Sequence, residues 1–358
     1  MITETNEVKS RISTENFESS DKTQRIAKYD NLRGLAMTLV VFGHVLGSFF
    51  YFNFYIDIFN FIYIFHMPLL FFISGYFTKI GSNSSEKAFK RILIPYIIFA
   101  IINTGIMIAI SLLMGKNLSE IQIFSPLLAL WYLAVLFIIR LIFPILIKIK
   151  HIFWVSLIIA LIAGLIAIHS HLDYLFCITL TMLPSFLLGY YYKNSTSKKL
   201  AYIFSFSKNK LIPLVLLIVL SIAIILVFSN VPYMFFMYKQ SFAQLGLSNI
   251  YGIIIKLGTI IFGFMMIILL NNVISDKKNF LTKVGVNSLA LYVLHNFLTH
   301  PVNLFLKTSF GLIIKNNIVL SSIFLIFVTI IIVFILSRDF VTNIVNKIIN
   351  SISNFVLS

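Results

Sequence analysis

Residues 33–45 read Arg33-Gly-Leu-Ala-Met-Thr-Leu-Val-Val-Phe-Gly-His44-Val, an apolar run with an arginine at its start and a histidine eleven residues later. A helix rises ~1.5 Å per residue, so this run places His44 ~16 Å from Arg33. A histidine that deep in an apolar helix needs either a polar partner or a chemical role. The run therefore predicts a transmembrane helix and a candidate functional residue together.

The composition is that of an integral membrane protein. Hydrophobic residues make up 59% of the 358 residues and charged residues only 11%, which is too apolar for a water-soluble domain. The formal net charge of +16 arises from short basic stretches between apolar runs, so we attribute it to membrane orientation and expect no nucleic-acid partner. The single cysteine, Cys177, excludes an intramolecular disulfide and a CxxC motif.

Apolar runs long enough to cross a bilayer predict about ten transmembrane helices. Because only elements with internally satisfied backbones can face lipid, we expect an all-α, polytopic helical bundle in the cell membrane. The predicted spans are 33–52, 58–78, 92–114, 124–147, 152–168, 174–192, 211–229, 250–270, 285–306 and 317–337.

The basic residues fall mostly on one side of these spans, so the positive-inside rule predicts that both termini are cytoplasmic. We expect a disordered cytoplasmic tail at 1–28, a membrane domain at 29–340 and a cytoplasmic C-terminal segment at 341–358. The segment 230–249 is too apolar for a free loop and too interrupted for a span. It either anchors at the membrane interface or dips back over a cavity.

Four titratable side chains are predicted near the middle of the membrane: His44, His66, His295 and Arg140. An arginine at that depth costs about 2.5–3.5 kcal/mol, so these groups should face a polar interior. The histidines could form hydrogen bonds between helices, ligate a metal or transfer protons. They lack HxxxH or HxxE spacing, so no metal is expected. Lys256, near the outer end of its predicted span, can snorkel toward the interface.

A basic cluster is expected at the cytoplasmic ends of the first three spans, comprising Arg33, Lys90 and Arg91 among others. Such a cluster could bind a phosphate-bearing donor beneath His44, or its members could be topological anchors. Asp30 lies three residues before Arg33 and could pair with it or hold an imidazole.

Several stretches together resemble the acyltransferase-3 family of membrane O-acyltransferases, especially its fucose 4-O-acetylase-like branch. The most specific feature is the spacing from Arg33 to His44, which is strengthened by His-Met-Pro-Leu at 66–69. The stretches are YDNLRGLAMTLVVFGHV (29–45), FHMPLLFFISGYF (65–77), AFKRILIPYIIF (88–99), LWYLAVLF (130–137), SFLLGYYYK (185–193) and VGVNSLALYVLHNFL (284–298).

The resemblance implies transfer of an acyl group, usually acetyl from acetyl-CoA, to a hydroxyl of an exported or lipid-linked glycan. On this interpretation Arg33 holds the phosphate of coenzyme A or orients the donor, and His44 is essential to acyl transfer. Where the family often has two arginines three apart, this chain has Lys90 and Arg91, and only Arg91 matches. The absence of an appended esterase-like domain suggests direct transfer to the glycan by the membrane domain.

The same chemistry gives the other polar residues expected roles. A neutral imidazole can deprotonate an attacking alcohol or accept the acyl group itself, and we assign His44 to one of these roles. His66 or His295 would orient His44 or the acceptor. Arg140 or Ser74 could stabilise the oxyanion.

Two other functions are compatible with these residues. A transporter or flippase of lipid-linked sugar could use midplane histidines for proton coupling, and it would not require coenzyme A. A non-catalytic scaffold of polysaccharide-synthesis machinery would tolerate the loss of His44. An acyltransferase could itself have that machinery as a partner.

Overall fold

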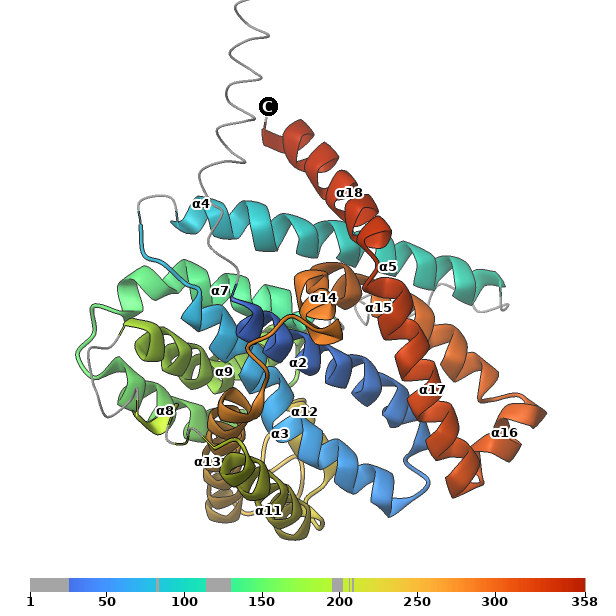
Figure 1. The fold of residues 1–358 in the computed structure, drawn as a ribbon, viewed down its shortest axis with the longest axis horizontal. Helices are drawn as coiled ribbons and strands as arrows, with labels where there is room; N and C mark the ends of the chain where they lie inside the picture. Colours follow the sequence, from blue (N-terminus) through green and yellow to red (C-terminus); the bar gives the residue numbers. More distant parts are fainter. Residues whose placement is uncertain are drawn as a thin grey trace, which may run out of the picture.

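The computed structural model describes residues 26–81, 84–113, 130–194, 202–205, 207 and 209–357. Within these residues the chain is helical and has no strand (Figure 1). The helices are α2 (Ala27–Leu46), α3 (Asn53–Tyr76), α4 (Ser84–Ala88), α5 (Ile94–Leu113), α7 (Trp131–Leu146), α8 (Ile152–Ile162), α9 (His171–Asn194), α11 (Leu211–Phe228), α12 (Tyr233–Met237), α13 (Asn249–Val273), α14 (Phe280–Val286), α15 (Ser288–Phe305), α16 (Ser309–Lys315), α17 (Ile318–Leu336) and α18 (Asp339–Leu357).

Each predicted apolar segment contains a helix, and the protein is a polytopic helical membrane protein. Among the described residues, seven helices are long and apolar enough to cross a membrane, and α15 with α16 forms an eighth candidate that is bent by 99°. The helices α7 and α8 are shorter. The predicted span 124–147 begins outside the described residues, and α7 itself starts at Trp131.

The predicted boundaries at the two ends of the chain shift slightly. The predicted tail 1–28 lies almost wholly outside the described residues, and α2 already begins at Ala27. The predicted C-terminal segment 341–358 is largely helix α18, which starts at Asp339. A five-residue π-helix, Phe89–Leu93, joins α4 to α5.

Hydrogen bonds fix which helix ends lie together. In α2 the side-chain amide of Asn31 donates to the carbonyl oxygen of Ser275 at 2.7 Å, just after α13. The ammonium of Lys210, before α11, donates to the carbonyl oxygen of Ile274 at 3.0 Å. The start of α2, the start of α11 and the end of α13 therefore share one end of the bundle, which we name the Arg33 end.

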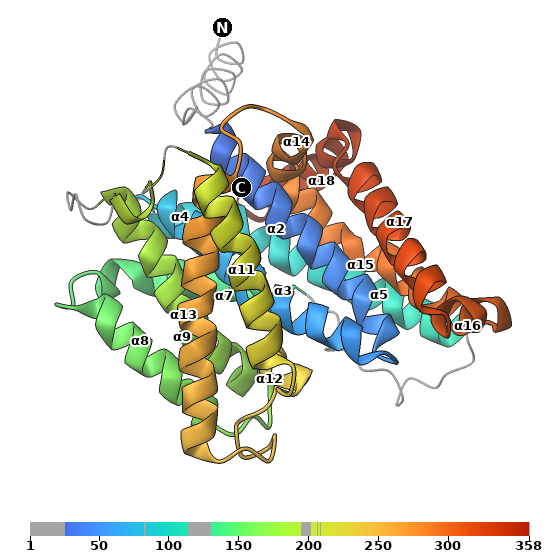
Figure 2. The same cartoon turned by 60° about the horizontal axis from the view of Figure 1, so that its bottom comes forward.

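The opposite end holds the connection between α11 and α13, residues 229–248, and we name it the loop end. Asn60, in the first half of α3, donates to the carbonyl oxygen of Val231 at 3.0 Å. Figure 2 shows α12 at the end of α11 that lies away from α14. The helix α15 runs toward the loop end, because Asn303 accepts a hydrogen bond there from Ser48, just beyond α2.

Two glycines allow α2 and α14 to pack with their backbones in contact. A Cβ at Gly34 would lie 2.1 Å from the carbonyl oxygen of Leu281, and a Cβ at Gly285 would lie 1.9 Å from that of Asp30. Small residues permit such close helix packing in membranes, where association depends on contact and not on hydrophobic exclusion. The two helices lie side by side in both views (Figures 1 and 2).

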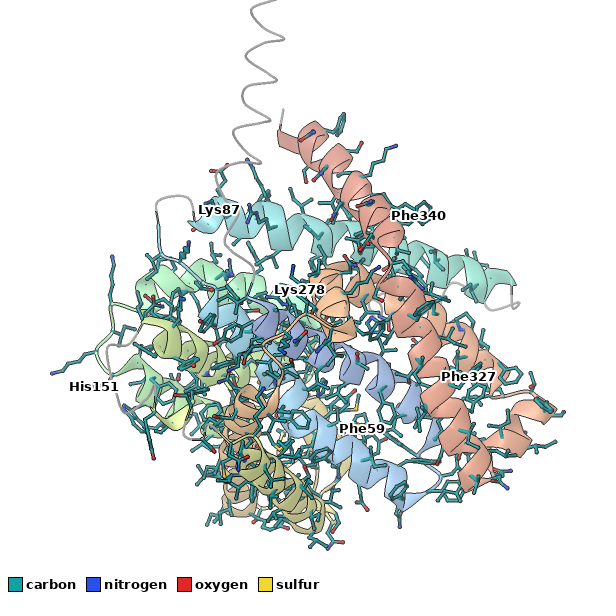
Figure 3. All side chains as sticks on the ribbon, in the orientation of Figure 1. Phe59, Lys87, His151, Lys278, Phe327 and Phe340 are labelled. Carbon is teal, nitrogen blue, oxygen red and sulfur yellow. The ribbon has the colours of Figure 1, made fainter. Side chains whose placement is uncertain are left out.

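The same device joins α3 to α9. A Cβ at Gly75 would meet the carbonyl oxygen of Phe186 at 1.9 Å, and a Cβ at Gly189 would meet that of Phe72 at the same distance. Both helices are mostly buried, whereas α11 and α17 turn large apolar side chains outward. Leu226 is 72% exposed and Phe327 is 61% exposed, and Figure 3 shows Phe327 at the periphery. These outer helices present the surface that lipid covers.

We expect Gly285→Ala to destabilise the protein by about 1–3 kcal/mol, because the added methyl group meets a backbone carbonyl that cannot rotate away. Thermal unfolding of the detergent-solubilised protein measures the loss. Gly105→Ala, in α5, is the control, since a Cβ there has no atom within 4 Å and alanine favours the helix. Equal thermal stability of both variants would contradict the role of the crossing.

Candidate active site

His44 lies near the end of α2 and lines a cavity at the loop end of the bundle. The cavity has a volume of about 250 Å³, and His44 is half-buried in its wall. The lining comes from α2, α3, α7, α9, α12 and α15 together with the residues after α12. It comprises His44, Tyr63, Met67, Trp131, Tyr174, Phe236, Met237, Tyr238, Lys239 and Asn296.

His295, in α15, packs its ring against that of His44. The ring centroids are 4.7 Å apart and the planes meet at 61°. His295 is fully buried, and its Nδ1 lies 2.6 Å from the carbonyl oxygen of Tyr292. Because a carbonyl can only accept, Nδ1 carries the proton. Its buried Nε2 has no hydrogen-bond partner among the described residues, so it is an available acceptor beside His44.

His66 lies behind one wall of the cavity. Its ring is 4.7 Å from that of Tyr63, which lines the cavity with His44. Its Nδ1 donates to the carbonyl oxygen of Ile62 at 2.8 Å. The structure thus brings His44 and His295 into direct contact and places His66 next to Tyr63.

A chain of polar contacts leads from the histidine pair toward α7 and α3. The Tyr292 hydroxyl accepts a hydrogen bond from the backbone amide of Tyr132 at 3.1 Å. The Tyr132 hydroxyl in turn lies 2.8 Å from the Ser74 hydroxyl. Ser74, a predicted oxyanion donor, therefore contacts Tyr132. Tyr132 is bonded through its backbone amide to the Tyr292 hydroxyl, and His295 contacts the backbone carbonyl of Tyr292.

Arg140, the other predicted oxyanion donor, lies on α7 beyond Tyr132. It is half-buried, and its Nε is buried without a hydrogen-bond partner among the described residues. Arg140 and Arg33 both lie within electrostatic range of Tyr132. Arg140 does not line the cavity itself, so it approaches the site from the side of the tyrosines.

Arg33 forms an ion pair with Asp30 one turn away. Nη1 of Arg33 is 3.1 Å from Oδ1 of the nearly buried Asp30. The guanidinium also lies 5.8 Å from the centre of the Phe77 ring. Of the two predicted partners for Asp30, the structure shows Arg33.

The two other predicted donor-binding residues lie on the π-helix before α5. Lys90 is paired with Glu86 at 2.7 Å on the exposed surface. Arg91 is exposed and close enough to Arg140 for their charges to repel. This π-helix packs against α7, which carries Arg140. Lys90 and Arg91 therefore lie on the α7 side of the site, whereas Arg33 lies on α2.

The segment 230–249 folds back over the cavity. The short helix α12 contributes Phe236 and Met237, and the next two residues, Tyr238 and Lys239, complete that wall. Tyr238 adopts a positive φ of 56°, which turns the chain sharply at the end of α12. The sequence pattern indicated a segment of this kind, but it did not single out Lys239.

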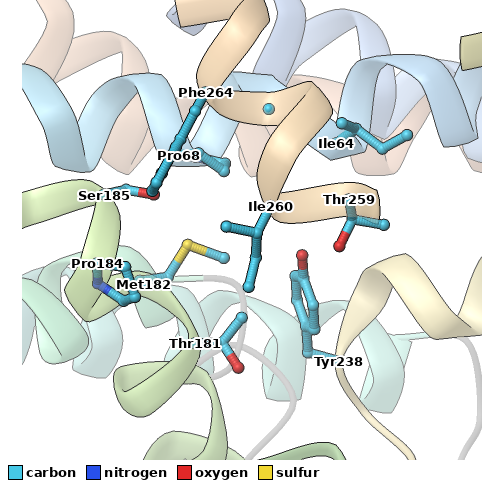
Figure 4. A pocket seen from close by; sticks show the side chains of 11 residues that line it. Ile64, Pro68, Thr181, Met182, Pro184, Ser185, Tyr238, Thr259, Ile260 and Phe264 are labelled. Carbon is cyan, nitrogen blue, oxygen red and sulfur yellow. The ribbon is translucent and has the colours of Figure 1, made fainter. Parts of the chain in front are cut away.

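Lys256 does not snorkel, and that prediction was wrong. The residue is only 3% exposed, and its ammonium donates to the Thr181 hydroxyl at 3.0 Å. The ammonium also lies 5.6 Å from the centre of the Tyr238 ring. Hydrogen bonding inside the bundle replaces the water that a snorkelling lysine would reach. Figure 4 shows Tyr238 and Thr181 beside a small neighbouring cavity.

Other lining residues escaped sequence reasoning, although some had a visible signal. Asn296 directly follows His295 in the stretch 284–298 and lies in the cavity wall. Tyr63 and Tyr174 carry no such signal, because aromatic residues are common throughout this chain. In the part of the chain that the structure describes, no group of three His, Cys, Asp or Glu side chains could hold a metal ion.

Comparison with known proteins identifies the family of this chain. Residues 26–338 match the family model described as an acyltransferase domain. Neither the curated proteins nor the solved structures contain a match to this chain. The family match covers most of the helices described above, including both histidines of the contact pair, and the chain belongs to the acyltransferase-3 family of membrane acyltransferases.

Proposed function

We propose that this acyltransferase moves an acetyl group from cytoplasmic acetyl-CoA to a hydroxyl of an exported or lipid-linked glycan at the cell membrane. The observation that carries the proposal is the contact between His44 and His295 at the wall of a cavity. An activated thioester needs little more than removal of the proton from the attacking alcohol, and a neutral imidazole performs that step.

In this mechanism His44 is the general base. Nε2 of His295, which has no hydrogen-bond partner among the described residues, is the proposed acceptor for one ring nitrogen of His44 during the reaction. The other nitrogen of His44 then takes the hydroxyl proton. The acceptor oxygen attacks the thioester carbonyl, the carbon–sulfur bond breaks, and the thiolate leaves. His66 supports the cavity wall through Tyr63, and Arg140 and Ser74 are the proposed oxyanion donors.

The donor is proposed to bind toward the Arg33 end, with its phosphates on Arg33, Arg91 and Lys90. Arg33 has the bidentate fork that phosphate recognition favours, and it shares α2 with His44. The acceptor would enter at the loop end, where the cavity lies. With the Arg33 end in the cytoplasm, as the positive-inside rule predicts, donor and acceptor approach from opposite sides of the membrane. Polysaccharide-synthesis machinery is a proposed partner.

We expect His44→Ala to abolish glycan acetylation, with at least a hundredfold loss of rate, because the general base is gone. Mass spectrometry of surface glycans from cells that carry each variant measures the outcome. His169→Ala is the matched control, since His169 is exposed and outside the cavity lining. Full acetylation by His44→Ala at a normal protein level would refute the assignment.

His295→Phe keeps a ring against His44 but removes the Nε2 acceptor. We expect kcat to fall about ten- to a hundredfold with KM for both substrates little changed, because base orientation acts in the transition state. The comparison variant is His66→Phe, which should cost less since His66 packs on Tyr63. If the two variants lose equal activity, direct contact with His44 is not the reason.

Arg33→Lys tests the donor site. Lysine keeps the charge but lacks the bidentate fork, so we expect KM for acetyl-CoA to rise about tenfold. Steady-state kinetics of the reconstituted protein give this value. Lys278→Ala is the control, because Lys278 is exposed at the same end of the bundle. An unchanged KM in Arg33→Lys would identify Arg33 as a topological anchor.

A further inference from the structure

The cavity that contains His44 is cationic, and nothing in its described lining balances the charge. Lys239 lines it, and no aspartate or glutamate is among the lining residues. A second small cavity on the other side of Tyr238 is lined by Lys256 and likewise by no carboxylate. Two lysines thus flank Tyr238 at the loop end.

Lys239 makes no ion pair or hydrogen bond with any residue that the structure describes. Its side chain is exposed at the mouth of the cavity. Loss of hydration against the cavity wall lowers the pKa of the Lys239 ammonium, and no nearby carboxylate counteracts that effect. Asp173, an acid at the same end, is already engaged by the backbone amides of His169 and Ser170. The ammonium therefore has no counter-ion among the residues that the structure describes.

The rest of the lining suits a sugar ring that carries an acidic group. Aromatic rings of Tyr63, Trp131 and Tyr174 form broad apolar walls, and such faces pack on the C–H faces of sugars. The side-chain nitrogen of Asn296 is buried and has no hydrogen-bond partner in the described part of the chain. Since an amide nitrogen can only donate, both Asn296 and Lys239 call for acceptor atoms on the ligand.

The size and position of the cavity narrow the ligand further. At about 250 Å³ it is smaller than the roughly 300–1,000 Å³ of drug-sized sites, so it holds about one sugar unit and not an oligosaccharide. It lies at the loop end, away from Arg33. The donor phosphates, proposed to bind at the Arg33 end, are therefore not the anion that Lys239 meets.

We propose that the acceptor is an acidic sugar, whose carboxylate or phosphate binds Lys239 while the hydroxyl to be acylated lies at His44. This inference rests on the proposed acyl transfer and specifies its substrate class. Lys239 is a specificity-determining residue at the rim of the cavity. Asn296, which follows His295 on α15, positions the sugar, whereas Lys239 belongs to the segment after α12.

The test uses the full chain in nanodiscs with labelled acetyl-CoA and three acceptor probes: methyl glucoside, methyl glucuronide and methyl glucoside 6-phosphate. We expect kcat/KM for at least one acidic probe to exceed that for the neutral probe about tenfold or more. The preferred acidic probe distinguishes carboxylate from phosphate. The preference should shrink with added salt, because a rim charge is screened.

Lys239→Gln should lower the ratio of acidic to neutral kcat/KM about tenfold, and Lys239→Arg should retain it. The matched control is Lys307→Gln, since Lys307 is also exposed at the loop end but does not line the cavity. Equal use of neutral and acidic probes by the native protein would overturn the proposal. So would a preference that Lys239→Gln leaves unchanged in folded protein.

Binding of the probes without acetyl-CoA separates this proposal from the proposed function. If the acidic probe binds in a Lys239-dependent manner but is never acylated, the acidic binding site is confirmed and acyl transfer to this ligand is refuted. If the neutral probe is acylated as efficiently as the acidic ones, acyl transfer is confirmed and the preference for an acidic acceptor is refuted. If no probe binds or is acylated, both are overturned.

Discussion

The backbone contact between α2 and α14 determines the geometry of the site. Gly34 and Gly285 lie at this crossing, where any Cβ would strike a carbonyl oxygen. His44 follows Gly34 by ten residues, and His295 follows Gly285 by ten residues. Both α2 and α15 run toward the loop end, and only Asn287 separates α14 from α15. Similar rises of ~15 Å therefore bring the two rings to the same depth. The crossing thus sets the register, and the histidine contact is its consequence.

The charged groups discussed above lie at opposite ends of the helix bundle. Arg33 and Asp30 form their ion pair near the start of α2, whereas Lys239 lies at the loop end with no described counter-ion. Between them, His295 is wholly buried. A low-dielectric interior strengthens the hydrogen bonds that a buried side chain makes, and it raises the cost of leaving one of its polar atoms without a partner. Nε2 of His295 has no partner among the described residues, so packing alone does not explain this buried group.

The sequence predicts the helices well because hydrophobic length and backbone satisfaction are local properties. It also places His44 correctly along α2, since helix rise is regular. The sequence does not predict a contact between side chains that lie far apart in the chain. Lys256 is an example, because nothing near it in the chain reveals that Thr181 on α9 accepts its hydrogen bond. The covering segment 230–249 was recognisable as unusual, but its contact with the cavity depends on tertiary packing. The equal glycine-to-histidine spacings were a usable signal for the His44–His295 contact.

The separation between Arg33 and His44 also constrains the proposed donor. A phosphate held at Arg33 lies ~16 Å from the histidine along α2, so the reactive carbonyl must sit at the end of a long, narrow arm. A coenzyme A thioester has such an arm, whereas a compact acyl phosphate does not. The cavity beside His44, in turn, has a volume of about 250 Å³ and includes Lys239, which has no counter-ion among the described residues. On the proposed mechanism, the two ends therefore bind ligands of different length and charge, and His44, which lines the cavity, is the group where they meet.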